Sequence, residues 1–339
     1  MKVSLITVSY NSARTIRDTL VSVQKQTYKD IEYIVVDGHS ADGTVEIVKQ
    51  FLDSAKDASQ DSAKDVSQDA MQDSSKDASQ DAMQDSAKDV SQDAMQDSAK
   101  DVSQDAMQDS AKDVSQDAMQ DSAKDAMQDS SKDASQDASQ GSAKGVVKKF
   151  LCEKDKGIYD AMNKGLALAT GDIIGVLNSD DFYCSNDVIE NVVRAFQENE
   201  TDCLYGDLNY VDPIDTSKIV RKWRSGAYLR ENFLKGWMPP HPTFFVKKSC
   251  YDSFGTFDTQ FKSAADYELM LRFLFKESCS AQHLPKVMIN MRAGGVSNVS
   301  LKNRIRANRE DRLAWKINGL KPKWFTLLRK PLSKLTQYF

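Results

Sequence analysis

Residues 170–183 join a short apolar run to polar side chains that could do chemistry. The apolar run, residues 173–177, follows a Thr-Gly-Asp turn signal, and this pattern is typical of a strand buried on both faces. The run ends in three polar residues, Asn178, Asp180 and Asp181. In open α/β sheets, ligands gather at the carboxyl ends of strands, where carboxylates can hold a divalent metal and thereby a phosphorylated ligand. The alternative is an acidic turn before a helix that begins near Asn186.

Two further carboxylates stand at the ends of predicted elements. Asp37 follows the apolar run 31–36, and Asp266 lies in the first turn of a helical pattern over residues 264–275. Carboxylates can accept a hydrogen bond from a nucleobase, help a metal to neutralise a diphosphate leaving group, or deprotonate a hydroxyl nucleophile. Together with Asp180, these groups suit direct displacement at a sugar carbon that carries a nucleoside diphosphate. For Asp266 the alternative is an ordinary acid favoured by the helix dipole.

The elements that must position these residues alternate in type. Strand patterns over residues 3–8 and 31–36 each precede a helical pattern, over residues 13–26 and from Thr44 onward. This order implies a parallel sheet whose loops share one edge, so that the ends of the first two strands lie side by side. Further along the chain, the patterns predict helices over residues 158–169 and 188–196 and strands over residues 203–205, 241–246 and 287–291. We therefore expect an α/β fold.

Residues 53–140 have a different character. Aspartate recurs at every fourth position in tetrads such as Asp-Ser-Ala-Lys, and the stretch contains no Gly, Pro, Leu or aromatic residue. A period of four drifts by about 40° per tetrad on an α-helix, so no apolar stripe forms. We interpret the stretch as a solvated, low-complexity insertion that is helical or irregular. The alternative is a spacer or a partner-binding arm.

The rest of the chain is basic. Outside residues 53–140 it carries 37 Lys and Arg against 28 Asp and Glu, which favours anionic partners. In the tail, residues 301–339, basic residues alternate with Trp324, Phe325 and leucines, a composition typical of a helix on an anionic membrane surface. The alternative for the tail is a basic helix packed on its own domain.

Several common sites are not indicated. No GxGxxG follows the first strand and no GxxxxGK[ST] occurs, which disfavours NAD-type and P-loop folds. The five cysteines form no CxxC pair and there are only three histidines, so a Cys/His zinc site is not expected. Free cysteines suit a reducing compartment, and the first apolar run is too short for a signal peptide. We expect a cytoplasmic protein.

Four motifs in sequence order resemble family 2 glycosyltransferases of the GT-A fold. They are Thr-Val-Ser-Tyr-Asn-Ser at residues 7–12, Val-Asp-Gly-His-Ser-Ala-Asp-Gly-Thr at 36–44, Asn-Ser-Asp-Asp at 178–181 and Ala-Asp-Tyr-Glu at 265–268. Residues 155–165 resemble a bacterial branch of the family that works on surface polysaccharides. The resemblance implies one discontinuous GT-A domain over residues 1–52 and 141–300, with a Rossmann-like, mostly parallel sheet flanked by helices. Residues 53–140 are then an insertion, and residues 301–339 a basic tail.

The same resemblance implies an inverting transferase that uses a nucleotide-sugar donor and a divalent metal, Mn or Mg. Asp266 would be the general base. Asp180 would bind the metal with Asp181 as a second ligand. The nucleotide-sugar would be held by Thr7, Ser9, Asn11, Asp37, Asn178, Asp181 and His241. For His241, which follows two prolines, the alternative is an ordinary residue at the start of a strand.

Two positions depart from the family pattern. Gly38 stands where many members have a second aspartate after Asp37, which alters the expected contact with the base. Asn178 replaces the first carboxylate of the usual Asp-x-Asp, so Asp180 would carry more of the metal binding.

We therefore expect sugar transfer onto a saccharide or a lipid-linked acceptor in cell-surface polysaccharide biosynthesis. The protein would work in the cytoplasm at the inner face of the plasma membrane, touch anionic lipid through its tail, and bind no nucleic acid. The rival hypotheses are a sugar-phosphate nucleotidyltransferase and a catalytically inactive GT-A scaffold. The sequence does not indicate which nucleotide, sugar or acceptor is used.

Overall fold

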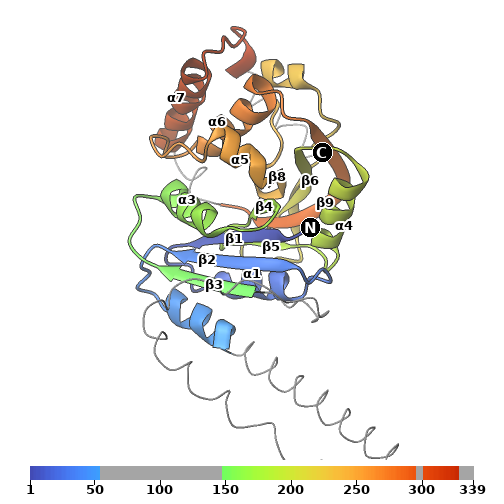
Figure 1. The fold of residues 1–339 in the computed structure, drawn as a ribbon. Helices are drawn as coiled ribbons and strands as arrows, with labels where there is room; N and C mark the ends of the chain where they lie inside the picture. The colour runs from blue at the N-terminus through green and yellow to red at the C-terminus, as the bar shows by residue number, and fades with distance from the viewer. Residues whose placement is uncertain (54–146, 295–300, 328–339) are drawn as a thin grey trace, which may run out of the picture. The chain divides into compact units, whose positions relative to one another are not determined.

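Four parallel strands form one end of the sheet (Figure 1). β1 (Val3–Ser9) lies between β2 (Ile31–Asp37) and β4 (Ile173–Val176), and β3 (Val147–Cys152) extends the group beyond β2. Every residue of β1 and β2 is buried, because helices cover both faces of the sheet. Ser9 pairs in register with Asp37, so the polar ends of the two strands reach the same edge.

The computed structural model describes residues 1–53, 147–294 and 301–327. Apart from Asp53, the expected insertion over residues 53–140 lies outside the described residues. The described part belongs to a single unit, Met1–Ala58 with Lys144–Phe339.

The remaining strands make the sheet mixed. Its order is β3-β2-β1-β4-β8-β6-β9-β5, with β7 paired to β6. These strands are β5 (Asp181–Tyr183), β6 (Cys203–Val211), β7 (Ile219–Trp223), β8 (Phe245–Lys247) and β9 (Ala281–Arg292). β4 and β8, β8 and β6, β6 and β7, and β9 and β5 are antiparallel pairs, whereas β6 and β9 run parallel. The α/β fold is therefore as expected, but the continuous parallel part is limited to β1, β2, β3 and β4.

Two hydrophobic clusters occupy the two faces of the sheet. Alternate side chains of β1 divide between them: Ile6 and Val8 join one cluster, and Val3 and Leu5 the other. The first cluster includes α3 (Ile158–Leu168), α5 (Lys248–Phe254), α6 (Ala265–Met270) and α7 (Leu301–Ile317). The second includes α1 (Ile16–Gln24), the helix over residues 44–53 and α4 (Val188–Glu198). The sheet is thus covered by helices on both faces (Figure 1).

Some elements differ from the sequence-based expectation. The segment 241–246 was expected to be a strand, but His241–Thr243 forms the short 3₁₀ turn η2 before β8. A strand cannot begin at His241 because Pro242 has no N–H to donate to a ladder. The loop-rich segment before it contains β7 and the 3₁₀ helix η1 (Arg230–Lys235), and α6 continues as the π-helical turn η3 (Leu271–Lys276).

The described part of the tail packs on the domain. In α7, Ala314 and Trp315 are buried, and the Trp315 indole N–H donates to the Tyr267 hydroxyl of α6 over 2.8 Å. This arrangement matches the alternative of a helix packed on its own domain up to residue 327. Among the described residues, no helix combines the length and the apolar character needed to cross a bilayer.

Candidate active site

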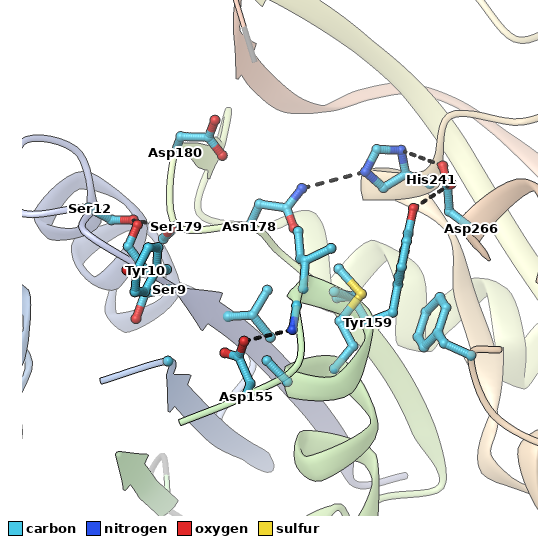
Figure 2. A pocket seen from close by; sticks show the side chains of 18 of the residues that line it. Ser9, Tyr10, Ser12, Asp155, Tyr159, Asn178, Ser179, Asp180, His241 and Asp266 are labelled. Carbon is cyan, nitrogen blue, oxygen red and sulfur yellow. Dashed lines mark hydrogen bonds and ion pairs between the residues drawn. The ribbon is translucent and has the colours of Figure 1, made fainter. Parts of the chain in front are cut away.

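A cavity of ≈ 1190 Å³ opens at the carboxyl ends of β1, β2 and β4 (Figure 2). Ligand pockets are typically about 300–1,000 Å³, so this one has room for a large ligand or for two. Six of the nine expected site residues line it, namely Ser9, Asn11, Asn178, Asp180, His241 and Asp266. These residues come from segments far apart in the chain, and the strand ends bring them together.

Hydrogen bonds join the loops after β1 and β2 at one wall of the cavity. The Asn11 amide N–H donates to Ser40 Oγ over 2.8 Å, and the Ala41 N–H donates to Asn11 Oδ1 over 3.0 Å. Asn11 has a φ of 51°, in the left-handed region that asparagine tolerates better than most residues. The loop that carries Asn11 is therefore held in one conformation beside the second strand.

Three expected residues lie behind the cavity wall and do not line it. Thr7 is buried in β1 and accepts a hydrogen bond from the Tyr33 hydroxyl over 3.0 Å. Asp37 is fully buried and accepts hydrogen bonds from Ser9 Oγ and from the N–H and Oγ of Ser40, each over 2.7 Å. Its carboxylate thus ties the ends of β1 and β2 together, and the cavity lining beside it is Gly38 and His39.

Asp181 is the third of these residues. It is the first residue of β5, and its side chain is fully buried, whereas that of Asp180 lines the cavity. Burial, together with the neighbouring charge of Asp180, raises the pKa of Asp181 well above its ordinary value. Burial also raises the pKa of Asp180. Arg292 supports this turn, since it donates to the Asp180 carbonyl over 2.6 Å and pairs with Asp18.

Asp266 lies at the opposite side of the cavity from Asp180 and has a donor on each of its oxygens (Figure 2). The Tyr159 hydroxyl donates to Oδ1 over 3.1 Å, and Nδ1 of His241 lies 3.3 Å from Oδ2. Nε2 of His241 lies 3.5 Å from Nδ2 of Asn178. Burial and the nearby Asp266 raise the pKa of Tyr159 well above its ordinary value, so this phenol stays protonated at neutral pH. Asp180 and Asp266 therefore face one cavity from different sides.

A protein-family model identifies the family to which the chain belongs. The model for glycosyl transferase family 2 matches residues 4–69 and 125–254, which is more than half of the chain. The chain belongs to this family.

Individual relatives of this family 2 domain match over shorter stretches. A PGL/p-HBAD biosynthesis glycosyltransferase of Mycobacterium tuberculosis is 28% identical over 147 residues, which cover 43% of this chain and 55% of the relative. A chondroitin synthase of Pasteurella multocida is 28% identical over 156 residues, which cover 46% of this chain and 16% of the relative. The chain thus spans about half, or less, of the length of these curated relatives.

Solved structures show the same fold. S. aureus TarS (1–349) in complex with UDP-GlcNAc aligns with a TM-score of 0.54 at 14% identity, over 94% of this chain and 65% of that one. The mannosyltransferase PcManGT from Pyrobaculum calidifontis, in complex with GDP-Man and Mn²⁺, aligns with a TM-score of 0.53 at 16% identity. That alignment covers 97% of this chain and 68% of that one. The expected GT-A fold is confirmed.

In this family 2 domain, the carboxylate of Asp155 occupies the space beside Gly38. A Cβ at residue 38 would lie 2.4 Å from Oδ2 of Asp155 and 3.2 Å from the Tyr10 ring. Asp155 lines the cavity and accepts a hydrogen bond from the Gly157 N–H over 2.8 Å. A side chain at residue 38 would therefore meet the carboxylate of Asp155.

Three tyrosines, Tyr10, Tyr159 and Tyr251, line the cavity and were not predicted as site residues. Tyr159 belongs to the motif over residues 155–165, whose resemblance to the family pointed to a functional segment without giving its contact with Asp266. Tyr10 lines the cavity with 66% of its surface exposed, which leaves an aromatic face free to stack on a base. The sequence feature that could have indicated a role for Tyr10 is its place inside the motif over residues 7–12.

Proposed function

We propose that the protein is an inverting glycosyltransferase that moves a sugar from a nucleoside-diphosphate-sugar to a saccharide or lipid-linked acceptor in cell-surface polysaccharide biosynthesis. The observation that carries the proposal is the pair of carboxylates, Asp180 and Asp266, that line one cavity from different sides. Asp180 lies on the side proposed for the departing diphosphate, and Asp266 lies on the side proposed for the attacking hydroxyl. The relatives, which include a chondroitin synthase and a PGL/p-HBAD biosynthesis glycosyltransferase, support a glycan product.

In this mechanism Asp266 acts as the general base. It accepts the proton of the acceptor hydroxyl as that oxygen attacks the anomeric carbon. The bond between that carbon and the diphosphate oxygen breaks on the opposite face, so the configuration of the sugar carbon inverts. The nucleoside diphosphate leaves with the electron pair. Ser9, Asn11 and Asn178 hold the nucleotide part from the strand ends, and Tyr10 stacks on the base.

A divalent metal, Mn or Mg, fits the residues at the end of β4. The side-chain groups there that could bind a cation are oxygens, which such hard cations prefer. Burial raises the pKa of Asp180, so a nearby cation would stabilise its ionised form. Oδ1 of Asn178 is buried without a hydrogen-bond partner in the described part of the chain. The described residues contain no cluster of three or more His, Cys, Asp or Glu side chains that could hold a metal. Asp180 would therefore hold the metal, and the metal would supply the positive charge that neutralises the departing diphosphate.

We also propose a peripheral contact with anionic membrane through the segment after α7. Thr326 anchors this segment by donating to the Leu234 carbonyl over 2.6 Å, while Trp324 keeps 85% of its surface exposed beside the exposed Lys321 and Lys323. Such a pairing of an exposed tryptophan with lysines suits a membrane interface. Trp324→Ala should lower sedimentation of the protein with phosphatidylglycerol vesicles several-fold. Equal sedimentation of the variant and the wild type would reject this contact.

Substitution of the base tests the proposed reaction. Nucleotide sugars, including UDP-GlcNAc and GDP-Man with Mn²⁺, are screened by mass spectrometry for hydrolysis or transfer. Asp266→Asn keeps the shape of the side chain but removes its basicity, so turnover should fall at least about 100-fold while calorimetric donor binding stays within about two-fold. Normal turnover in this variant would contradict the role of Asp266. Asp258→Asn, a change at a half-buried residue before α6 that does not line the cavity, is the control.

A further inference from the structure

Three elements meet at the carboxylate of Asp266, and a fourth reaches it through the His241 ring. Tyr159 comes from α3, His241 from η2 and Asn178 from the loop after β4, whereas Asp266 itself lies in the first turn of α6. Tyr159 and His241 occupy different oxygens of the carboxylate, at 3.1 Å and 3.3 Å (Figure 2). Two donors on two oxygens fix the plane of a carboxylate. Each oxygen still has a lone pair free to accept a proton.

The contact with Asn178 determines how the His241 ring can be protonated. A hydrogen bond from Nδ1 to Asp266 requires the proton on Nδ1, which leaves Nε2 as an acceptor in the neutral ring. Nε2 faces Nδ2 of Asn178 over 3.5 Å, and an amide nitrogen can only donate. Nδ2 of Asn178 also lies 3.5 Å from Oδ2 of Asp181, which is a second acceptor that orients the amide. Both neighbours of the ring therefore favour the Nδ1–H tautomer.

We propose that Tyr159 and His241 are positioning residues that aim Asp266 at the acceptor hydroxyl, and that Asn178 fixes the His241 tautomer that this requires. The inference rests on the proposed function, because it assumes that Asp266 is the base. It gives Asn178 a reason to replace the usual carboxylate: a carboxylate at that position has no hydrogen to donate to Nε2. The Asn178 side chain thus connects the end of the donor-binding strand to the base through one imidazole ring.

The tautomer can be observed without any substrate. The chain has three histidines, so long-range ¹H–¹⁵N spectra of the full chain labelled at histidine contain three ring systems, and His39→Gln and His283→Gln assign them. We expect the neutral form of His241 to carry its proton on Nδ1, which is the minor tautomer of free histidine. Asn178→Ala should shift the population toward Nε2–H. A proton on Nε2 in the wild-type chain overturns the inference, whatever the protein turns out to bind.

Kinetics test the positioning role. With UDP-GlcNAc or GDP-Man as donor and Mn²⁺ present, Tyr159→Phe should lower kcat roughly 10-fold, the loss expected for one hydrogen bond to a charged group, with the donor KM within about two-fold. His241→Ala should lower kcat by a similar factor. His241→Asn should recover part of the loss, because its amide nitrogen takes the place of Nδ1.

Matched controls separate positioning from general destabilisation. Tyr228→Phe removes a hydroxyl that donates to a carbonyl away from the cavity, over 2.8 Å, and His283→Asn alters the other His–Asp pair, in which Nε2 lies 2.9 Å from Asp207. Both controls should leave kcat within about two-fold. Wild-type kcat in Tyr159→Phe and His241→Ala would overturn the inference. Absence of donor binding by wild-type protein in calorimetry would instead reject the proposed function, and the histidine spectra would still decide on the tautomer.

Discussion

Asp180 and Asp181 are adjacent in the chain but have different surroundings. Asp181 begins β5, and the alternation of a strand turns its side chain and that of Tyr183 into the core while Phe182 turns outward. Asp180, one residue earlier, belongs to the turn and faces the cavity. Sequence reasoning placed both carboxylates at the strand end but did not predict the short strand β5, and therefore assigned both to the ligand. The metal proposal now rests on Asp180.

Asp37, at the end of β2, is another residue whose location could be predicted from the sequence although the direction of its side chain could not. Its position after the apolar run predicted that it would lie near the cavity, and it does. The direction of its side chain depends on Ser9 and Ser40, which satisfy its two oxygens, and these partners come from loop conformations that strand patterns do not encode. Residue types thus predicted the location of the site better than the role of each side chain.

At the scale of elements, the periodicity of apolar residues predicted β1, α1, β2, α3, β4 and α4 close to their observed bounds. β3 was not predicted, because it starts at the border of the repetitive stretch and carries Lys148 and Lys149 in place of apolar residues. Lys149 has a specific partner, since its Nζ lies 2.7 Å from Glu32 of β2. A buried glutamate in the middle of an apolar strand is the feature from which a lysine-bearing neighbour could have been expected.

Glu32 supports the parallel part of the sheet. It is 1% exposed, accepts hydrogen bonds from Ser4 and Thr170, and pairs with Lys149 and Lys2. Burial raises the pKa of this carboxyl, but the hydrogen bonds, first that from Lys149, outweigh it and lower the pKa from 4.5 to about 2. Because the folded state binds the proton less readily than the unfolded state, Glu32 stabilises the fold above about pH 4.5. That stabilisation is lost as the pH falls toward 2.

Glu32→Gln should therefore lower the free energy of unfolding by about 1–3 kcal/mol at pH 7, the cost of unpaired buried groups. The difference from the wild type should shrink at pH 3. Urea unfolding at both pH values measures it, with Glu46→Gln on the exposed face of the helix over residues 44–53 as the control. A difference of the same size at both pH values would contradict the ionic role of Glu32.

At the scale of the whole molecule, the cavity depends on contacts between distant parts of the chain. Tyr159 and Asp266 are 107 positions apart, and Asn178 and His241 are 63 apart. No local pattern predicts such contacts; only the known order of motifs in a family does. The division of the chain into a GT-A domain over residues 1–52 and 141–300, an insertion over 53–140 and a tail remains our proposal. All the residues assigned to the cavity lie in the described ranges 1–53, 147–294 and 301–327.

Removal of the repeat tests this division. A chain in which Ala58 is joined directly to Lys144 keeps the helix over residues 44–53, β3 and every residue assigned to the cavity. Because insertions in surface connections cost little loop-closure free energy, we expect nucleotide binding within about two-fold of the full chain and a similar melting temperature. Loss of nucleotide binding or of cooperative unfolding would show that the repeat belongs to the domain.

The most direct test of the central claim is calorimetric titration of the full chain with UDP, GDP and dTDP, with and without Mn²⁺. We predict that one of these nucleotides binds and that Mn²⁺ strengthens its binding. Asp180→Asn should remove most of the strengthening by Mn²⁺, about 10-fold or more for a charge-assisted contact, whereas Asp181→Asn should largely keep it. The account would be contradicted if no nucleotide bound, or if Mn²⁺ strengthened binding to the Asp180→Asn variant as much as to the wild type.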